Sequence, residues 1–296
     1  MDIQWYPGHM TRAIRQMKED IKIIDLVIEL LDARIPLSSR NPDIDTLGQG
    51  KARLLLLNKR DLSDDKITEE WLSYFKEKGY VALAMDAREK KDVKRVDAAV
   101  EEACKEKRER NKRRGIVNRP IRAMVVGIPN IGKSSFINSY AGRSAAKTGN
   151  KPGVTKGKQW IRLKKDLELL DTPGILWPKF EDNTVGLHLA FIGSINDAII
   201  ENRELSMELV DFLKSYDGKP VRLMEVCGSH THAIVKHGIR DLLSPKIELL
   251  SGPGCPVCVT PTAYIDKLID LAKQADTTVV TFGDLLRVPG SKESLN

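Results

Sequence analysis

A chain of 296 residues is long enough for two domains, and its composition, 41% hydrophobic and 5% aromatic, is ordinary for a soluble α/β protein. No apolar run approaches the roughly 20 residues of a membrane-spanning helix, and no apolar stretch follows a basic start as in a secretion signal. We therefore expect a cytoplasmic protein with no membrane partner, while the net charge of +7 and the isoelectric point near 9.1 favour an anionic partner.

Short apolar runs alternate with amphipathic stretches from the N-terminus to about residue 175. The apolar runs that we expect to form strands are 23–31, 53–57, 81–85, 123–126, 159–163 and 167–170. Helical patterns at 66–78 and 92–108 lie between some of them. Strands that alternate with helices predict a doubly wound α/β domain with a mostly parallel sheet, which binds ligands beyond the carboxyl ends of its strands.

The pattern changes after this domain. Residues 184–214 favour helices without clear strands, and a second α/β pattern begins after "YDGKP" at 216–220. Its expected strands are 222–226, 246–250 and 277–282. We therefore predict an α/β domain at 1–183, a short helical segment at 184–215 and a smaller α/β fragment at 216–296.

The stretch "GIPNIGKSS" at 127–135 fits the phosphate-binding pattern G-x-x-x-x-G-K-[ST]. It follows the expected strand "AMVV" and precedes an expected helix, which is the context that the pattern requires; the alternative is a glycine turn without a ligand. Lys133 would neutralise the β- and γ-phosphates and Ser134 would hold Mg²⁺. The residues of the loop predicted to bind nucleotide are Asn130, Ile131, Gly132, Lys133, Ser134 and Ser135.

A second phosphate-side motif, "DTPG" at 171–174, ends an expected strand. This geometry directs the Asp171 carboxylate at Mg²⁺ through water and leaves the Gly174 N–H for the γ-phosphate. Between the two motifs lies "KPGVTKGKQW", in which Thr155 could offer a second hydroxyl to Mg²⁺ from a switch loop.

The stretch "LLLLNKRDL" at 54–62 carries the guanine-recognition pattern N-K-x-D directly after an apolar run. Asp61 can accept hydrogen bonds from guanine N1 and N2, which adenine does not offer, so the site would reject ATP. Asn58 would hold the neighbouring loop, and the Lys59 stem would cover the base. In "MDAR" at 85–88, Asp86 and Ala87 follow the next strand, and the Ala87 N–H could meet guanine O6.

The order of these motifs is the reverse of that in an ordinary GTPase, because the base motifs precede the phosphate motifs. Since connections run over the surface of a parallel sheet and chain ends lie close together, the sheet tolerates such a permutation. The switch region at 171–174 then leads straight into the following segment. We therefore predict a circularly permuted P-loop GTPase domain whose nucleotide state steers the C-terminal segment.

The combination of "WYPGHM", "LLDARIPLSSRNP", "LLNKRDL", "GIPNIGKSSFIN", "KPGVTKGKQW" and "LLDTPGILWP" resembles the circularly permuted ribosome biogenesis GTPase A family over about residues 1–200. The resemblance implies a GTPase that binds GTP and GDP and assists assembly of the large ribosomal subunit, with rRNA as a partner. Ile175 stands where Ras-like enzymes have a water-orienting Gln, and the resemblance implies that His9 takes that catalytic role; a capping or packing role for His9 is the alternative. It also implies K⁺ at Asn130.

The densest basic run is "KEKRERNKRRG" at 105–115. It fits a solvated helix end, or alternatively a surface that meets RNA phosphates. No aromatic residues interleave with these charges, so stacking of single-stranded bases there is not expected.

Three cysteines fall in the last part of the chain, whereas Cys104 stands alone in a charged helix. Cys227 and His230 could present a thiolate and an imidazole to one iron. Cys255 and Cys258, spaced C-x-x-C, could close as a disulfide or act as a redox pair.

From about residue 205, "RLMEVCGSHTHAIVKHGIRDLL", "IELLSGPGCPVCVTP" and "TFGDLLRVPGSKESL" resemble hydrogenase maturation protein HypD, although Ser229 replaces a glycine of that family. The resemblance implies that Cys227 carries an iron unit with His230 nearby, and that Cys255 and Cys258 form its thiol pair. A tetrahedral zinc site that includes His230 or His232, or an inert fragment, would fit the same residues.

We favour a GTP-hydrolysing ribosome assembly factor for the chain as a whole, because its nucleotide motifs are complete. The alternative is an iron or thiol carrier that works with hydrogenase maturation proteins and has the GTPase domain as a fusion partner. A third hypothesis is an RNA-binding protein that holds nucleotide without turnover.

Overall fold

The computed structural model describes residues 6–116, 119–142, 145, 159–164, 166–180, 182–195, 202–225, 228–252, 260–274, 277, 279 and 286–295. The chain divides into two compact units, Met1–Leu205 and Ser206–Asn296. The division falls within helix α7 (Asn202–Lys214), earlier than the boundary expected at 215–220.

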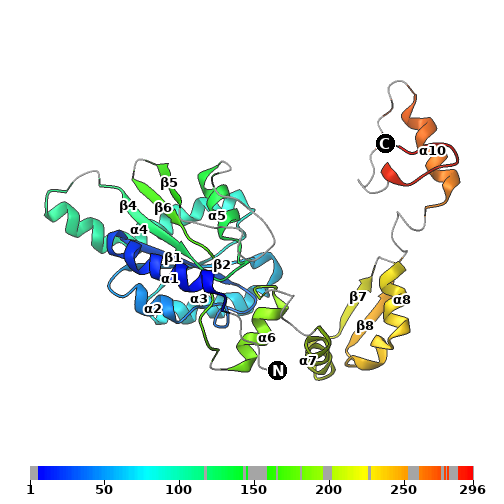
Figure 1. Ribbon diagram of the computed structural model, residues 1–296, viewed down its shortest axis with the longest axis horizontal. Helices are drawn as coiled ribbons and strands as arrows, with labels where there is room; N and C mark the ends of the chain where they lie inside the picture. Colours follow the sequence, from blue (N-terminus) through cyan, green and yellow to red (C-terminus); the bar gives the residue numbers. More distant parts are fainter. Residues whose placement is uncertain are drawn as a thin grey trace. The chain divides into compact units, whose positions relative to one another are not determined.

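The first unit is built on a six-stranded sheet in the order β3-β2-β1-β4-β6-β5 (Figure 1). Its strands are β1 (Leu26–Asp32), β2 (Ala52–Asn58), β3 (Val81–Ala84), β4 (Ile121–Val126), β5 (Gln159–Lys164) and β6 (Leu167–Asp171). All neighbouring strands run parallel except β5, which pairs antiparallel with β6 at the edge. The predicted mostly parallel α/β sheet is therefore confirmed.

Helices connect the strands and lie on both sides of the sheet (Figure 1). They are α1 (Gly8–Asp20), α2 (Asp43–Leu47), α3 (Asp65–Glu77), α4 (Lys90–Arg113), α5 (Lys133–Ala141) and α6 (Asn183–Phe191). Aspartates cap two of them: Asp64 accepts a hydrogen bond from the Ile67 N–H in the first turn of α3, and Asp182 accepts one from the Thr184 N–H in α6. Such caps satisfy N–H groups that have no partner within the helix.

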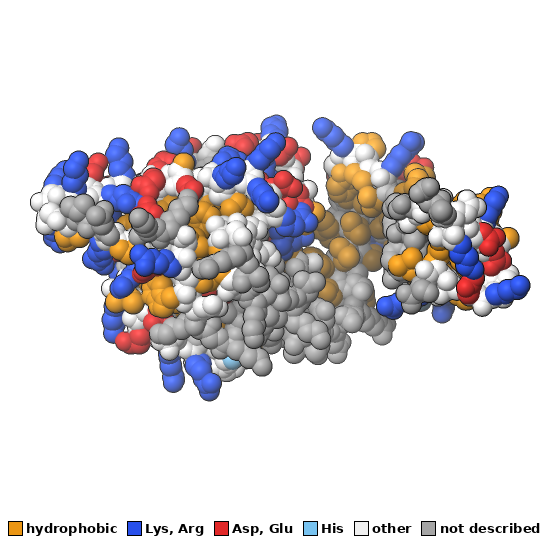
Figure 2. All heavy atoms as spheres, turned by 90° about the horizontal axis from the view of Figure 1, so that it is seen from above, with side chains coloured by type: hydrophobic (Ala, Val, Ile, Leu, Met, Phe, Trp, Pro, Cys, Tyr) orange, Lys and Arg blue, Asp and Glu red, His pale blue; other side chains and the backbone are white. Residues whose placement is uncertain are grey.

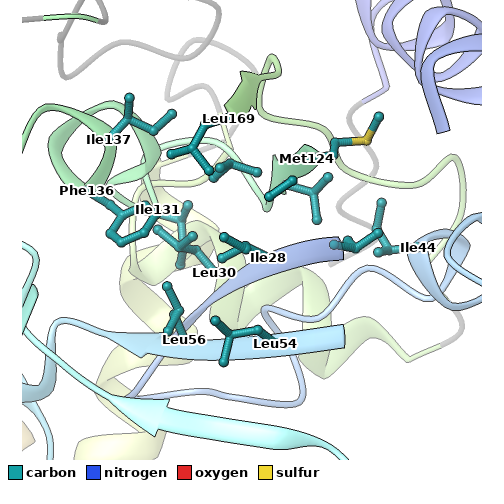
Figure 3. Packing of buried hydrophobic residues seen from close by; sticks show 14 of the residues in the cluster. Ile28, Leu30, Ile44, Leu54, Leu56, Met124, Ile131, Phe136, Ile137 and Leu169 are labelled. Carbon is teal, nitrogen blue, oxygen red and sulfur yellow. The ribbon is translucent and has the colours of Figure 1, made fainter. Parts of the chain in front are cut away.

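The alternation of side chains along β2 assigns α5 and α3 to opposite faces of the sheet. Leu54 and Leu56 belong to a cluster with Phe136 of α5, whereas Leu55 and Leu57 pack in another cluster with Phe75 of α3. Figure 3 shows the first of these clusters around β1 and β2. Because both faces are covered by helices, both sets of leucines are buried, which explains the unbroken apolar run in β2.

Pairing of β1 with both β2 and β4 joins the early and late parts of the unit in one sheet. Asp32 at the end of β1 is in register with Asn58 at the end of β2, and Val125 near the end of β4 is in register with Asp171 at the end of β6. The base and phosphate motifs therefore emerge at one edge of the sheet, although they are far apart in the sequence.

The second unit contains a parallel pair of strands, β7 (Val221–Glu225) and β8 (Ile247–Ser251), with α8 (Gly228–Lys236) between them in the chain and α10 (Thr262–Ala272) after them. The strands expected at 222–226 and 246–250 are thus present. Most of the strand expected at 277–282 lies outside the described residues. Within the parts of the chain that the structure covers, no helix has the length and apolar character needed to cross a membrane.

Candidate functional site

The phosphate loop connects β4 to α5 and adopts a backbone that depends on glycine. Gly127 and Gly132 have φ angles of 152° and 96°, in the region that other residues rarely adopt. A Cβ atom on Gly132 would also lie 2.5 Å from Asn58 Nδ2. The loop thus brings backbone N–H groups and the N-terminus of α5 together, an arrangement suited to phosphate oxygens.

Lys133, the first residue of α5, folds back over this loop. Its Nζ donates hydrogen bonds to the carbonyl oxygens of Gly127 and Ile128, at 3.1 and 2.8 Å. Burial lowers the pKa of Lys133 to about 8, and the nearby Asp171 carboxylate opposes that shift. Both hydrogen-bond partners of this buried ammonium in the described part of the chain are neutral carbonyl oxygens. It therefore gains from an added anion, because the anion offsets its lost hydration.

Asp171 ends β6 and is buried beside Lys133. Burial raises the pKa of Asp171 to about 6, while Lys133 and a hydrogen bond from the backbone near Thr172 act in the opposite direction. Its Oδ1 atom is buried and has no hydrogen-bond partner among the described residues. An unpartnered carboxylate oxygen beside a phosphate loop is the kind of ligand that Mg²⁺ prefers, directly or through water.

Gly174 of the "DTPG" stretch passes close to the phosphate loop. A Cβ atom there would lie 2.8 Å from Pro129 Cα and 2.9 Å from Lys133 Nζ. Thr172 fixes the start of the stretch by donating its hydroxyl to the Val125 carbonyl at 2.7 Å. The structure therefore needs glycine at 174, and it places this turn against the phosphate loop.

Asn58 connects the loop after β2 to two other loops. Its Nδ2 donates to the Ile131 carbonyl at 2.8 Å, and its Oδ1 accepts the Ala87 N–H at 2.9 Å. The phosphate loop and the loop after β3 are thereby held together by one buried amide. The Ala87 N–H, which we expected to meet guanine O6, donates to Asn58 in this structure.

Lys59 adopts a left-handed backbone with φ 61° directly after β2. Its Nζ lies 3.2 Å from Asp32 Oδ2, and Asp32 is fully buried at the end of β1. Hydrogen bonds and charge from Arg34 and Lys59 hold the pKa of Asp32 below its usual value, although burial opposes them. The sheet neighbour of β2 thus positions the lysine of the N-K-x-D pattern.

Asp61 and Asp86 are brought together by Arg88. The Arg88 Nη2 atom donates to Asp61 Oδ2 at 2.6 Å and to Asp86 Oδ2 at 2.7 Å. Two residues predicted to form the base site, one after β2 and the other after β3, therefore share one guanidinium.

Comparison with known proteins agrees with the GTPase domain that the motifs predict. Residues 122–233 match the family described as "50S ribosome-binding GTPase". Over 225 residues, 76% of this chain and 75% of the relative, the sequence is 51% identical to Ribosome biogenesis GTPase A of Bacillus cereus. The chain belongs to the ribosome biogenesis GTPase A family. The protein of that name from Priestia megaterium is 52% identical over 217 residues, which are 73% of this chain and 75% of that one.

A solved structure extends the likeness to the fold. The GNP-bound YlqF from T. maritima has a TM-score of 0.52 and 26% identity, covering 79% of this chain and 88% of that chain. The family resemblance and the GTPase activity predicted from the motifs are thus confirmed, and the reversed motif order reflects a circular permutation.

Residues 203–296 match a different family, HypD, described as "Hydrogenase formation hypA family". This match covers only the last part of the chain, whereas the ribosome biogenesis GTPase A relatives cover most of it. The resemblance of that part to HypD is therefore present, but hydrogenase maturation is not favoured as the function of the whole chain.

Several predicted site residues cannot be compared with the structure. Thr155, Cys227, Cys255 and Cys258 lie outside the described residues, and so does the side chain of His230 in α8. In the described ranges no group of three or more His, Cys, Asp or Glu side chains is arranged to hold a metal. The iron, zinc and thiol hypotheses stay predictions. Cys104, by contrast, is described as a free and buried thiol whose pKa burial raises to about 11.

The phosphate loop has a contact that sequence analysis missed. Asn130, with φ 56°, donates its side-chain N–H to the Gly193 carbonyl at 2.6 Å, and the Ser194 hydroxyl donates to the Pro129 carbonyl at 2.9 Å. Residues 193 and 194 follow α6, beyond all the nucleotide motifs. Nothing in their spacing signals the contact.

Arg88 and Asp32 were also missed, although the sequence offers a signal for each. Arg88 directly follows the predicted pair Asp86 and Ala87. Asp32 ends an expected parallel strand, as Asn58 ends the next one, and polar residues at the carboxyl ends of adjacent strands meet at one edge of the sheet.

Proposed function

We propose that this GTPase holds GTP or GDP with Mg²⁺ at the carboxyl edge of the sheet and assists assembly of the large ribosomal subunit. The observation that supports the site most directly is the Asn58 amide. It contacts the Ile131 carbonyl in the phosphate loop and the Ala87 N–H in the loop after β3. Because one buried side chain spans both loops, a base near Asp61 and phosphates near Lys133 can belong to one nucleotide.

The residues at the phosphate end fit Mg²⁺. Asp171 offers the unpartnered Oδ1 atom, and Ser134 lies half-buried in the first turn of α5. Mg²⁺ commonly uses one or two protein oxygens, with substrate phosphates and water as its other ligands. Bound there, it would neutralise charge on the β- and γ-phosphates, while Lys133 binds the same oxygens. Thr155 remains the proposed second hydroxyl.

Hydrolysis needs a group that orients water, because Ile175 stands in the position of the usual Gln and is buried, with its N–H directed at the Gly127 carbonyl. We assign this role to His9. The residue beside it, Met10, contacts the Leu176 N–H through its sulfur at 3.5 Å. Helix α1 therefore packs against the segment that follows "DTPG", which supports the assignment.

We propose that the state of the nucleotide reaches residues 184–215 through α6. His188 of α6 and Ser38, in the loop after β1, are joined by a 2.9 Å hydrogen bond, and Gly193 accepts from Asn130 in the phosphate loop. If K⁺ binds at Asn130, the amide oxygen is the atom that contacts it, because the amide nitrogen donates to Gly193. A shift of the phosphate loop would then move the segment at the end of α6, because Asn130 is hydrogen-bonded to Gly193.

The C-terminal part of α4 is the surface that we propose for rRNA phosphates. Cys104 is the last buried residue of this helix, and the following residues up to Arg113 include Lys105, Arg110 and Lys112. Figure 2 shows Lys and Arg side chains spread around the edge of the first unit on the drawn face, so the proposal rests on this helix end and not on one broad patch. Phosphate contacts of this kind weaken as salt rises.

Measurement of GTP hydrolysis, with and without large ribosomal subunit particles, tests the proposal. Lys133→Ala should weaken nucleotide binding by about 10²-fold or more, because it removes the buried cation. His9→Ala should lower kcat by about 10²-fold and leave GDP affinity within a factor of about two. Lys91→Ala, which changes an exposed lysine near the site, is the matched control and should behave as the wild type.

Three outcomes would contradict parts of the proposal. Equal competition by ATP and GTP would remove Asp61 from its role in base recognition. Unchanged hydrolysis in His9→Ala would remove the catalytic assignment. Hydrolysis that ribosomal particles never stimulate would argue against the assembly role, even if nucleotide binding is intact.

A further inference from the structure

Arg88 is the first residue after the Asp86–Ala87 pair, and its guanidinium joins two carboxylates from different loops. It donates from Nε to Asp86 Oδ1 at 3.0 Å and from Nη2 to Asp86 Oδ2 at 2.7 Å. The same Nη2 reaches Asp61 Oδ2 at 2.6 Å. Pairing through two nitrogens fixes the plane of the guanidinium as well as its position.

The Asp86 end of this arrangement is anchored. Asp86 is buried, its Oδ1 also accepts the Arg88 N–H at 2.9 Å, and its own N–H donates to Asp92 Oδ2 at 2.9 Å in the first turn of α4. The Arg88 side chain is 70% exposed, and that of Asp61 is 33% exposed. The Arg88 side chain is therefore fixed at the protein surface, and its guanidinium contacts the carboxylate of Asp61.

The negative charges of Asp61 and Asp86 explain why a cation is needed between them. Asp61 and Asp86 contact the same nitrogen atom, and two carboxylates that close together repel each other unless a cation lies between them. Hydrogen bonds from Arg88 instead hold the pKa of Asp86 below its usual value. With Arg88 in place, the Asp86 carboxylate keeps its charge and the Asp61 carboxylate is held in a defined orientation.

We propose that Arg88 is a positioning residue for guanine recognition, which it serves by holding the Asp61 carboxylate against Asp86. The inference rests on the proposed nucleotide site. A carboxylate oxygen has two lone pairs, so the bond from Arg88 to Oδ2 leaves acceptor positions on both oxygens for guanine N1–H and N2–H. Because the guanidinium is fixed on Asp86, it can hold the Asp61 carboxylate in place without occupying the acceptor positions that guanine needs.

Competition of unlabelled diphosphates against a fluorescent GDP analogue tests this role on the full chain. GDP offers Asp61 both N1–H and N2–H, IDP offers N1–H alone and ADP offers neither. Arg88→Ala should weaken GDP by about tenfold or more, weaken IDP less and leave ADP unchanged, so that the preference for GDP over IDP narrows. Arg88→Lys keeps one charge without the two-nitrogen geometry and should fall between Arg88→Ala and the wild type.

A double substitution tests the charge argument separately. If Asp86 disturbs Asp61 once Arg88 is gone, then Asp86→Ser combined with Arg88→Ala should bind GDP more tightly than Arg88→Ala alone. Lys91→Ala removes an exposed positive charge three residues away and should leave every affinity unchanged. Circular dichroism melting of each variant confirms that the fold is retained.

Opposite results overturn the inference. GDP affinity that stays the same or rises in Arg88→Ala would mean that the guanidinium does not support Asp61. An equal loss for GDP, IDP and ADP would place its effect on the phosphate loop or the fold. A wild-type chain that does not prefer GDP over ADP would instead contradict the proposed nucleotide site, before any variant is compared.

Discussion

Strands β2 (ARLLLLN) and β7 (VRLME) both contain consecutive apolar residues, but the surroundings of these residues differ. In β2, Leu54 and Leu56 are completely buried, because parallel strands flank β2 on both sides and helices cover both faces of the sheet. In β7, Leu223 and Met224 are 50% and 58% exposed, and among the residues that the structure describes the sheet of the second unit has two strands. Two paired strands are marginally stable by themselves. The apolar residues of β2 lie in the core of the first unit, whereas those of β7 are about half exposed and the described core of the second unit lies around Ile265 and Ile269 of α10.

The two units also differ in where they bury polar groups. In the first unit, several buried polar side chains lie at or near the carboxyl ends of strands, among them Asp32, Asn58, Asp86, Lys133 and Asp171, while Asp25 and Glu29 are buried just before β1 and within it. Among the described residues of the second unit, Ser244 is the buried polar residue. Burying a charge costs stability unless the charge is paired. Glu29 and Asp25 have ion-pair partners in Arg53 and Lys107, whereas the buried Lys133 at the ligand edge has no ion pair within 4 Å among the described residues.

Hydrogen exchange should show the largest difference between the units. Amides of β1, β2 and β4 should exchange at least about 10³-fold more slowly than those of β7 and β8, because they open only when the core unfolds. Mass spectrometry of peptides from the native full chain measures this. Comparable protection in β7 and β8 would show that the second unit has a core of its own.

Truncation of matched leucines should give the next largest effect. Leu56→Ala should lower the free energy of unfolding by about 2 to 5 kcal/mol, because it leaves a cavity in a packed core. Leu223→Ala should change the melting of the second unit by less than about 0.5 kcal/mol, as for other exposed residues. All four tryptophans precede residue 205, so their fluorescence follows the first unit, and circular dichroism follows both.

The smallest expected effect concerns the buried charge at the ligand edge. The pKa of Lys133 falls from 10.5 to about 8 on folding, so the unfolded chain binds more protons between those values and stability should rise with pH across that window. Lys133→Met should abolish this rise. It should also stabilise the nucleotide-free first unit at pH 7 by about 1 kcal/mol, because relief of the roughly 3 kcal/mol that the pKa shift represents is offset by about 2 kcal/mol for the lost hydrogen bonds to Gly127 and Ile128. Urea denaturation followed by tryptophan fluorescence measures both effects.

Lys91→Met provides the control for that experiment, since it removes an exposed lysine and should keep the pH dependence of the wild type. A Lys133→Met variant that is less stable than the wild type at pH 7 would mean that the ammonium stabilises the fold even without an anion. The idea that the buried ammonium at the ligand edge lowers the stability of the nucleotide-free unit would then be wrong.

Sequence analysis predicted the elements of the first unit because its signals are local. The run at 53–57 is apolar throughout, and β2 formed at Ala52–Asn58; the run at 123–126 gave β4 at Ile121–Val126. The domain boundary at 215–220 stays a prediction, because the division into compact units within α7 follows from tertiary contacts and not from turn residues. Burial in the second unit also could not be predicted, since apolar strands suggest a core without showing what covers them.

The sequence by itself determined the family, the sheet and the order of the nucleotide motifs, because each of these rests on neighbouring residues and strand patterns. Tertiary structure alone decided which groups meet: the Asn58 amide with the Ile131 carbonyl, Arg88 with Asp61, and the Asn130 amide with the Gly193 carbonyl. These pairs join loops that leave different strands or follow different helices. Their distances depend on strand order and register, which set the geometry of the sheet edge and cannot be calculated from spacing along the chain.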